Sequence, residues 1–252
     1  MQTNSETPPV ALMDVPVALV FMTRLPLPAL PASAFERSSI VTWAYPLAGL
    51  VLGLLAALLW AVTGWLGLSA PLQAGVSLAA LALMTGALHE DGLADMADGF
   101  WGGHDATRRL EIMKDSRIGS YGVLALIFAV GLRWGGLTEA GIAALIAAAC
   151  LSRAILPLMM YFGPFARPDG LAKSVGQPPK ISVAVSIAIG LVVAWACVGF
   201  GAMLIAALVV FLVGECLHKL AKYKIGGVTG DVLGATQQLS ELAVLLALAA
   251  VI

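Results

Sequence analysis

A run of 51 residues, from 38 to 88, contains no Asp, Glu, Lys, Arg or His. A membrane-spanning helix needs roughly 20 mostly apolar residues. The run is therefore long enough for two such helices, with a break at GWLGLSAP, residues 64–71. Charged residues make up only 12% of the chain, about half the share that soluble domains usually carry. The sequence therefore predicts an integral membrane protein.

Five further apolar runs extend this pattern along the rest of the chain. In total we expect about seven spans, within a range of six to eight, near residues 42–63, 72–89, 119–135, 140–162, 181–199, 201–218 and 237–252. Glycines at 135–136 and 199–201 are the expected turns between neighbouring spans. Because open sheet edges cannot be satisfied in hydrocarbon, residues 1–252 are expected to form a single all-α polytopic membrane domain.

The N-terminal segment, residues 1–40, differs from the spans. Its apolar part, residues 9–22, is short and holds Asp14 and Pro16, which favours an interfacial or re-entrant helix over an eighth span. The first nine residues contain no Lys or Arg and so lack the basic start of a signal peptide. Insertion is therefore expected to use the spans themselves.

Long polar connections alternate with short apolar ones. The four long connections fall on one side of the predicted topology and carry 12 of the 14 Lys and Arg residues: 23–37, 90–118, 163–180 and 219–236. Basic loops favour the cytoplasmic side, so we expect these four to face the cytoplasm. Arg133 is placed in a short loop on the opposite side, and Arg153 lies within a span. The net charge of −1 leaves no basic stripe for a nucleic-acid partner.

Negative charge is concentrated in HEDGLADMADGF, residues 89–100. Three carboxylates stand at i, i+4 and i+7 on one face of a helix that would continue out of the second span: Asp91, Asp95 and Asp98. Such like charges repel unless a cation lies between them, and hard oxygen ligands favour Mg²⁺ or Mn²⁺. Gly92 and Gly99 are expected to interrupt the helix, so that a ligand approaches closely. The alternative is a solvated acidic helix end.

The next stretch, RLEIMKDSRIG at 109–119, repeats the theme. It interleaves the carboxylates Glu111 and Asp115 with the cations Lys114 and Arg117, which suits metal and phosphate together. A salt-bridged amphipathic helix is the alternative, since i, i+3 pairs would suffice. His89 and His104 flank the acidic cluster, and either could be a general base or an orienting residue.

A Gly-rich loop is predicted at 219–236, and it overlaps the motif KIGGVTGDVLGATQQLSE at 224–241. Gly227, Thr229 and Asp231 could bind a phosphate through backbone N–H groups that precede a helix, although a flexible turn explains the glycines equally well. Arg153 is an intramembrane charge and therefore a functional candidate, with a carboxylate or a phosphate as its partner. Upstream, four polar residues share one face at the end of a span: Glu215, His218, Lys219 and Lys222.

Several longer motifs carry a resemblance to a known family. They are FMTRLPLP at 21–28, EDGLADMADGFWGG at 90–103, RRLEIMKDSRIGSYG at 108–122, SRAILPLMMYFGPFARPDGLAKSVG at 152–176 and GGVTGDVLGATQQLSE at 226–241. In this order they resemble the cobalamin synthase, or adenosylcobinamide-GDP ribazoletransferase, family. The resemblance implies a Mg²⁺-dependent enzyme of the bacterial inner membrane. It would join adenosylcobinamide-GDP to α-ribazole or its 5′-phosphate, release GMP, and yield adenosylcobalamin or its 5′-phosphate.

Part of the acidic pattern is also similar to the motif of CDP-alcohol phosphotransferases. Here Asp95-x-x-Asp98-Gly99 is followed by Glu111-x-x-x-Asp115, but the Ala-Arg after the first Gly is missing, Glu replaces the third Asp, and the second pair comes sooner. The shared chemistry would be transfer of a phosphoryl group from a nucleoside diphosphate to an alcohol. A phosphotransferase of this type acting on another alcohol is therefore one alternative. A corrinoid transporter or scaffold is the other.

The resemblance suggests roles for the candidate residues. The catalytic candidates are Asp95, Asp98, Glu111 and Asp115, and Mg²⁺ would be held by Asp91, Asp95, Asp98 and Asp115. The substrate-binding candidates are Lys114, Arg117, Arg153, Arg167, Gly227, Thr229 and Asp231. The base could be Glu111, an Asp outside the metal shell, or His104. The expected partners are the small-molecule substrates and the bilayer, and a homo-oligomer or association with other cobalamin-assembly enzymes is left open.

Overall fold

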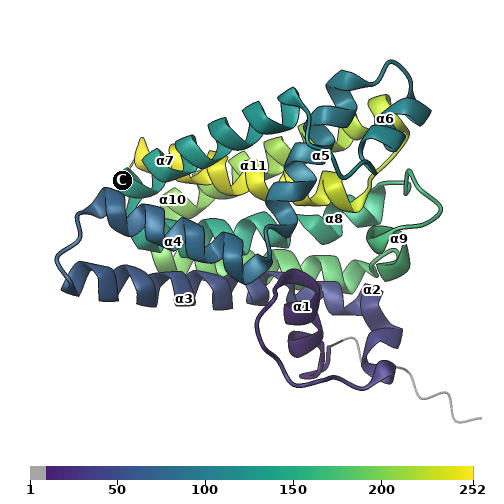
Figure 1. Cartoon of the computed structure of the whole chain (residues 1–252). Coiled ribbons are helices and arrows are strands. Elements are labelled where there is room, and N and C mark those ends of the chain that lie inside the picture. The colour runs from purple at the N-terminus through teal and green to yellow at the C-terminus, as the bar shows by residue number, and fades with distance from the viewer. Residues whose placement is uncertain (1–9, 252) are drawn as a thin grey trace, which may run out of the picture.

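The computed structural model describes residues 10–251, so the predictions for the first nine residues lie outside the described part (Figure 1). Within that part every regular element is a helix, and one isolated bridge joins Phe165 to Val228. The long helices are α3 (Tyr45–Trp65), α4 (Ala70–Thr85), α5 (Leu88–Gly102), α7 (Ser120–Ala154), α10 (Lys180–Ile225) and α11 (Gly230–Ala249). The short ones are α1 (Asp14–Met22), η1 (Ala32–Arg37), α2 (Ser38–Val41), η2 (Thr42–Ala44), α6 (Ala106–Ile112), α8 (Leu156–Phe162) and α9 (Leu171–Val175). The predicted all-α class is confirmed.

Four helical stretches in the described residues are long and apolar enough to cross a membrane: Ala32–Trp65, Ser120–Phe162, Lys180–Ile225 and Gly230–Ala249. The bent pair of α4 and α5 makes a fifth if it is counted as one span. Many large apolar side chains of α3 and α10 point outward, as Leu58 and Phe211 do, which suits contact with lipid. The membrane class is confirmed, whereas the count of seven stays a prediction.

Helix α7 doubles back on itself. Arg133 and Arg153 both pair with Glu241, although 20 residues of straight helix would separate them by about 30 Å. The reversal lies at Gly141, whose φ of 76° and ψ of 178° are non-helical. Gly199 interrupts α10 in the same way, with φ 81° and ψ 169°. The predicted turn at 199–201 is thus confirmed, but the one at 135–136 is wrong because those residues are helical.

The junction of α4 and α5 is sharply bent, by 86°. Gly86 and Ala87 both adopt left-handed backbone angles, with φ of 64° and 55°. The prediction of one helix continuing from the second span into the acidic cluster is therefore wrong. Instead, α5 turns away from α4 and runs toward α6 (Figure 1).

Small residues let the spans pack closely, as the small-x-x-x-small spacing of Gly49 and Gly53 in GLVLG, residues 49–53, predicts. A Cβ atom added to Gly49 would lie 2.2 Å from the carbonyl oxygen of Ala149, and one added to Gly53 would lie 3.0 Å from Cα of Ile146. Helix α3 therefore meets the second half of α7 backbone to backbone. This contact fixes the position of α3 relative to α7.

The polar segments gather at one end of the bundle, where Figure 1 shows α5, α6 and α9 near the start of α11. Arg109 donates to the backbone oxygen of Lys224 at 2.9 Å, and Lys224 Nζ donates to the backbone oxygen of Phe100 at 2.9 Å. Lys114 Nζ lies 3.2 Å from Asp169 Oδ2. The segments predicted as loops at 90–118, 163–180 and 219–236 are thus in mutual contact, although much of their length is helical.

The N-terminal segment is held by one buried carboxylate. Asp14 forms an ion pair with Arg37 at 2.9 Å and accepts a hydrogen bond from Trp43 Nε1 at 2.7 Å. Helix α1 thereby packs on the start of α3. Its nine residues are too few to span a bilayer.

Candidate active site

Helices α5 and α11 cross with their backbones in contact. A Cβ atom on Gly92 would lie 2.9 Å from the backbone oxygen of Asp231, and one on Gly234 would lie 3.4 Å from Cα of His89. Gly92 was expected to admit a ligand, but its space is filled by α11. Gly99 is likewise filled, because its Cβ would lie 2.3 Å from Met113 Cγ. Both glycines are helical, so the predicted interruptions are wrong.

The crossing brings the carboxylates of α5 beside Asp231 of α11. Burial, with the negative charges of Asp91, Asp231 and Asp98, raises the pKa of Asp95 to about 7. The positive charge of Arg167 acts in the opposite direction and lowers the pKa of Asp95. Arg167 Nη1 also lies 3.1 Å from Asp231 Oδ2. Three predicted site residues from separate polar segments therefore meet: Asp95, Arg167 and Asp231.

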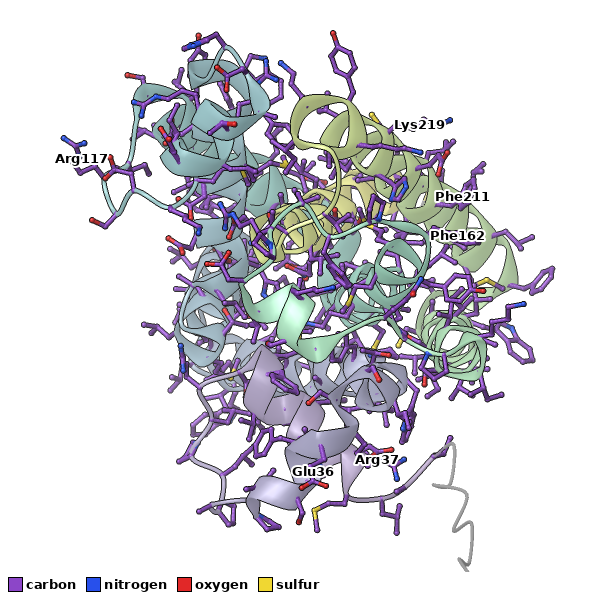
Figure 2. All side chains as sticks on the ribbon, turned by 90° about the vertical axis from the view of Figure 1, so that its right-hand side faces the viewer. Glu36, Arg37, Arg117, Phe162, Phe211 and Lys219 are labelled. Atoms are coloured by element: carbon purple, nitrogen blue, oxygen red, sulfur yellow. The ribbon has the colours of Figure 1, made fainter. Side chains whose placement is uncertain are left out.

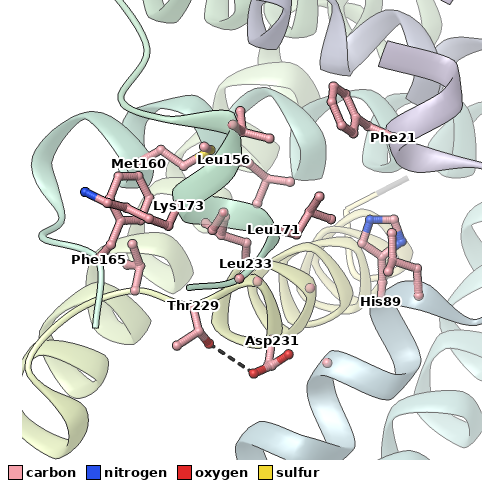
Figure 3. A pocket seen from close by; sticks show the side chains of 18 of the residues that line it. Phe21, His89, Leu156, Met160, Phe165, Leu171, Lys173, Thr229, Asp231 and Leu233 are labelled. Carbon is pink, nitrogen blue, oxygen red and sulfur yellow. Dashed lines mark hydrogen bonds between the residues drawn. The ribbon is translucent and has the colours of Figure 1, made fainter. Parts of the chain in front are cut away.

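Thr229 sets the position of Asp231 at the first turn of α11. Its hydroxyl accepts from the backbone N–H of Val232 at 3.3 Å, which caps the helix, and donates to Asp231 Oδ2 at 3.2 Å (Figure 3). Thr229 is 3% exposed. The helix cap thus holds the carboxylate of Asp231 toward Arg167.

An apolar pocket opens beside these groups, with a volume of about 200 Å³. We call it the α9 pocket, because α9 and the segment before it cover one side. Its apolar wall includes Phe21, Leu156, Met160, Phe165, Leu171 and Leu233. Asp91, Arg167, Thr229 and Asp231 form its polar side, and Figure 3 shows His89 at one end and Lys173 near Phe165.

The cover of the pocket is fixed by pairing between two loops. Ala166 N–H donates to Val228 O at 3.0 Å, and Val228 N–H donates to Pro164 O at 2.8 Å. A Cβ atom on Gly227 would lie 2.1 Å from Pro164 O. Gly227, expected to bind phosphate, therefore allows the close approach of residues 164–166. The predicted long Gly-rich loop shortens to residues 226–229.

Asp98 lies in α5 but points at α7. Its carboxylate accepts from the backbone N–H of Gly119 at 2.7 Å and of Gly122 at 2.9 Å. Asp98 is 8% exposed. Its oxygens thus satisfy the free N–H groups at the start of a helix, which is a structural task.

The charged stretch at 109–119 lies outside the α9 pocket. Its charged side chains form three exposed ion pairs: Arg108 with Glu111 at 3.0 Å, Lys114 with Asp169 at 3.2 Å, and Arg117 with Asp115 at 2.7 Å. Hydrogen bonds from Arg117 lower the pKa of Asp115 to about 2. Figure 2 shows Arg117 at the rim, pointing away from the body of the protein. His104 is also exposed, 3.1 Å from Asp105. The salt bridges of the alternative are present, but the helix of that alternative ends at Ile112.

Arg153 lies in a buried ionic network. It is 3% exposed, donates to Ala149 O at 3.0 Å and lies 3.6 Å from Glu241 Oε2. Arg133 pairs with Glu241 and with Glu90, the latter at 3.4 Å. Of the two partners predicted for Arg153, the structure provides the carboxylate. The prediction of Arg133 in an outer loop is wrong, because its guanidinium is buried among helices.

The donor chemistry at the crossing suits a hard cation, although the part of the chain that the structure describes has no three His, Cys, Asp or Glu side chains arranged to hold a metal. Of the four predicted ligands, Asp98 accepts from two backbone N–H groups at the start of α7 and Asp115 pairs with Arg117. Burial and the negative charges of Asp91, Asp231 and Asp98 raise the pKa of Asp95. A divalent cation would offset the repulsion between these charges.

Sequence reasoning missed the buried pair of Arg133 and Glu241 and the pocket wall. Glu241 stands inside an apolar run, and the rule for intramembrane charges that singles out Arg153 would have found it too. No spacing rule marks Phe21, Leu171 and Leu233, because these residues meet only through tertiary packing.

Apolar spans, with carboxylates and a guanidinium beside a pocket at one end, define a multi-pass membrane enzyme with an acidic site. The chain belongs to the family described as cobalamin-5-phosphate synthase, which it matches over residues 14–249. It is 46% identical to the adenosylcobinamide-GDP ribazoletransferase of Bradyrhizobium diazoefficiens, over 99% of this chain and 98% of the relative. Proteins of that name from Azorhizobium caulinodans and Mesorhizobium japonicum are 44% and 41% identical, over 93% of this chain and 94% and 92% of theirs. No solved structure matches.

Proposed function

We propose that the protein transfers the phospho-cobinamide group of adenosylcobinamide-GDP to α-ribazole or its 5′-phosphate and releases GMP. The observation that carries the proposal is the meeting of Asp91, Asp95, Asp231 and Arg167 beside the α9 pocket. Membership of the family and the names of three relatives support the same reaction.

The reaction needs one bond to form and one to break. A ribose hydroxyl oxygen of α-ribazole bonds to the phosphorus attached to cobinamide, while the bond from that phosphorus to the bridging oxygen breaks. The bridging oxygen leaves with the electron pair as part of GMP, and the hydroxyl proton passes to a base. Arg167, 14% exposed and planar, suits contact with a phosphate oxygen near the breaking bond.

Mg²⁺ is the cofactor that this proposal requires. Asp91, Asp95 and Asp231 would hold it, in place of the predicted set that included Asp98 and Asp115. When bound, the ion would neutralise the charge of the pyrophosphate. The chain's own contribution is to keep the carboxylates close through the crossing of α5 and α11.

We also propose that this end of the bundle faces the cytoplasm of a bacterial inner membrane. The segments at 90–118, 163–180 and 219–236 contact one another and hold 10 of the 14 basic residues. Such a bias favours the cytoplasmic side. Single cysteines at Arg108 and Lys173 should therefore react together with an impermeant reagent from that side. Labelling from opposite sides would reject this orientation.

The decisive assay uses detergent-purified protein with adenosylcobinamide-GDP, α-ribazole and Mg²⁺, and reads cobalamin and GMP together. Equal amounts of both products are expected, and neither when one substrate is omitted. A transporter or a scaffold would release no GMP. Release of CMP from a CDP-alcohol, without reaction of the cobinamide substrate, would favour the phosphotransferase alternative.

A further inference from the structure

The α9 pocket is apolar on most of its surface. Leu156 and Met160 on α8, Leu233 on α11 and Phe21 on α1 supply wall from elements far apart in the sequence (Figure 3). An apolar cavity of about 150 Å³ is large enough for benzene. The 200 Å³ of this pocket therefore admits one fused bicyclic ring, and the far larger corrin macrocycle does not fit.

His89 supplies one hydrogen-bonding group to this wall. The residue is 3% exposed and lines the pocket, and its Nδ1 atom has no partner among the residues that the structure describes. Buried ring nitrogens are nearly always hydrogen-bonded. A ligand atom inside the pocket could form the hydrogen bond that His89 Nδ1 lacks.

The chemistry of the wall distinguishes between the two bases available in the reaction. Guanine carries polar groups along a whole edge, and the apolar part of the wall, with Phe21, Leu156 and Met160, would leave those that face it unpaired, which is unfavourable. A benzimidazole has an apolar benzene ring and, once attached to ribose, a single free ring nitrogen. The apolar part of the wall matches the benzene ring of the second base, and the unpaired Nδ1 atom of His89 matches its free ring nitrogen.

We infer that the α9 pocket binds the benzimidazole base of α-ribazole, with His89 Nδ1–H donating to the free ring nitrogen of the base. The inference rests on the proposed function, because that function supplies the ligand. A base seated there would place its ribose toward Thr229, Asp231 and Arg167, which form the polar side of the same pocket. The pocket would thus select the acceptor by its base.

Binding of two free bases tests the hydrogen bond directly. Benzimidazole and indole have the same shape, but indole has a C–H group where benzimidazole has its acceptor nitrogen. The purified full chain should bind benzimidazole about tenfold more tightly than indole, and His89→Leu should bind both equally. His89→Asn places an amide nitrogen near the position of Nδ1 and should restore part of the preference. Because each comparison is made within one variant, partial unfolding cannot produce the result. Equal binding of both bases by the wild type would overturn the role of His89.

Binding of α-ribazole, without nucleotide or Mg²⁺, tests the pocket itself. Leu171 is 51% exposed at the pocket, so Leu171→Trp should fill the space without disturbing the core and weaken binding at least about tenfold. Leu208→Trp, on an outward position of α10 that is 57% exposed, is the matched control and should bind normally. Unchanged α-ribazole binding in Leu171→Trp, or loss of GDP binding in its place, would overturn the inference.

The two proposals can fail separately. If wild-type protein releases GMP while Leu171→Trp has a normal KM for α-ribazole, only the pocket assignment is wrong. If wild-type protein binds α-ribazole in the α9 pocket but releases no GMP, the reaction is wrong and the pocket assignment stands.

Discussion

Arg167 and Asp231 face each other with 3.1 Å between Nη1 and Oδ2, and their side chains are 14% and 22% exposed. The pair joins the segment before α9 to the first turn of α11. Arg167 also donates to Leu110 O at 3.2 Å, so the same guanidinium reaches the end of α6. One side chain thus connects all three polar segments at the site.

Loss of this pair should be severe for turnover. We expect Asp231→Asn to lower kcat/KM at least about 100-fold, because it removes the charge that we propose binds the metal while keeping the shape. Arg167→Lys keeps the charge but loses the planar donor pair, and should raise KM about tenfold. The exposed pair of Lys114 and Asp169 holds the same segment, so Lys114→Gln is the control and should stay near wild type. Steady-state GMP release measures all three.

The apparent affinity for Mg²⁺ should fall as the pH is lowered through neutrality. Asp95 has a pKa near 7, so it is protonated below that pH and ionised above it. Protons and metal compete for the carboxylate, so affinity should weaken by up to about tenfold per pH unit below pH 7. Asp91→Asn removes one of the charges that raise the Asp95 pKa and should shift the midpoint to lower pH. Mg²⁺ titrations of activity would measure this, and a midpoint unaffected by Asp91→Asn would contradict it.

The crossing of α5 and α11 should tolerate no side chain at Gly92. Gly92→Leu would push into the backbone of Asp231 and is expected to destabilise the protein by about 1–3 kcal/mol and to abolish turnover. Gly131→Leu is the matched control, since its Cβ meets nothing within 4 Å and it lies on an exposed face of α7. Thermal unfolding in detergent and GMP release should separate the two variants. Equal behaviour would show that the helices do not depend on this contact.

Asp98 and Asp115 should behave independently. Asp98→Asn loses the charged acceptor for two N–H groups at the start of α7 and should destabilise the fold by about 1–3 kcal/mol. Asp115→Asn breaks only an exposed pair and should leave both stability and turnover near wild type. Their effects should add. If each variant alone abolished turnover and the double variant were no worse, the two would act as one metal-binding unit, as the sequence predicted.

Hydropathy predicted the membrane class well, because a span must be apolar along its whole length. The charged segments were the expected place of the site for the same reason, since few places in this chain hold charges, and Asp91, Arg167 and Asp231 from these segments line the α9 pocket. Spacing along one helix, however, could not show that Asp98 turns to α7 while Asp95 faces α11. That choice depends on the bend at Gly86 and Ala87, where Ala87 adopts a left-handed conformation that its residue type disfavours.

Turn positions were also hard to place from glycines alone. Gly135 and Gly136 remain helical, and a Cβ on Gly136 would approach the backbone of Leu245 at 3.2 Å, so Gly136 serves close packing. Gly141 makes the turn instead. Both uses of glycine look alike in a sequence, because each needs only the absence of a side chain.

The buried network has a consequence for how the protein is made. Arg133 and Arg153 lie in α7, whereas Glu241 lies in α11, the last helix. An arginine in mid-membrane costs about 2.5–3.5 kcal/mol when inserted without a partner. During translation both arginines therefore leave the ribosome before the glutamate that neutralises them exists. Glu90, already synthesised, reaches Arg133 but does not pair with Arg153. The last helix to be synthesised thus closes the assembly, and a nascent chain that stops short of it leaves a cation without its counter-ion.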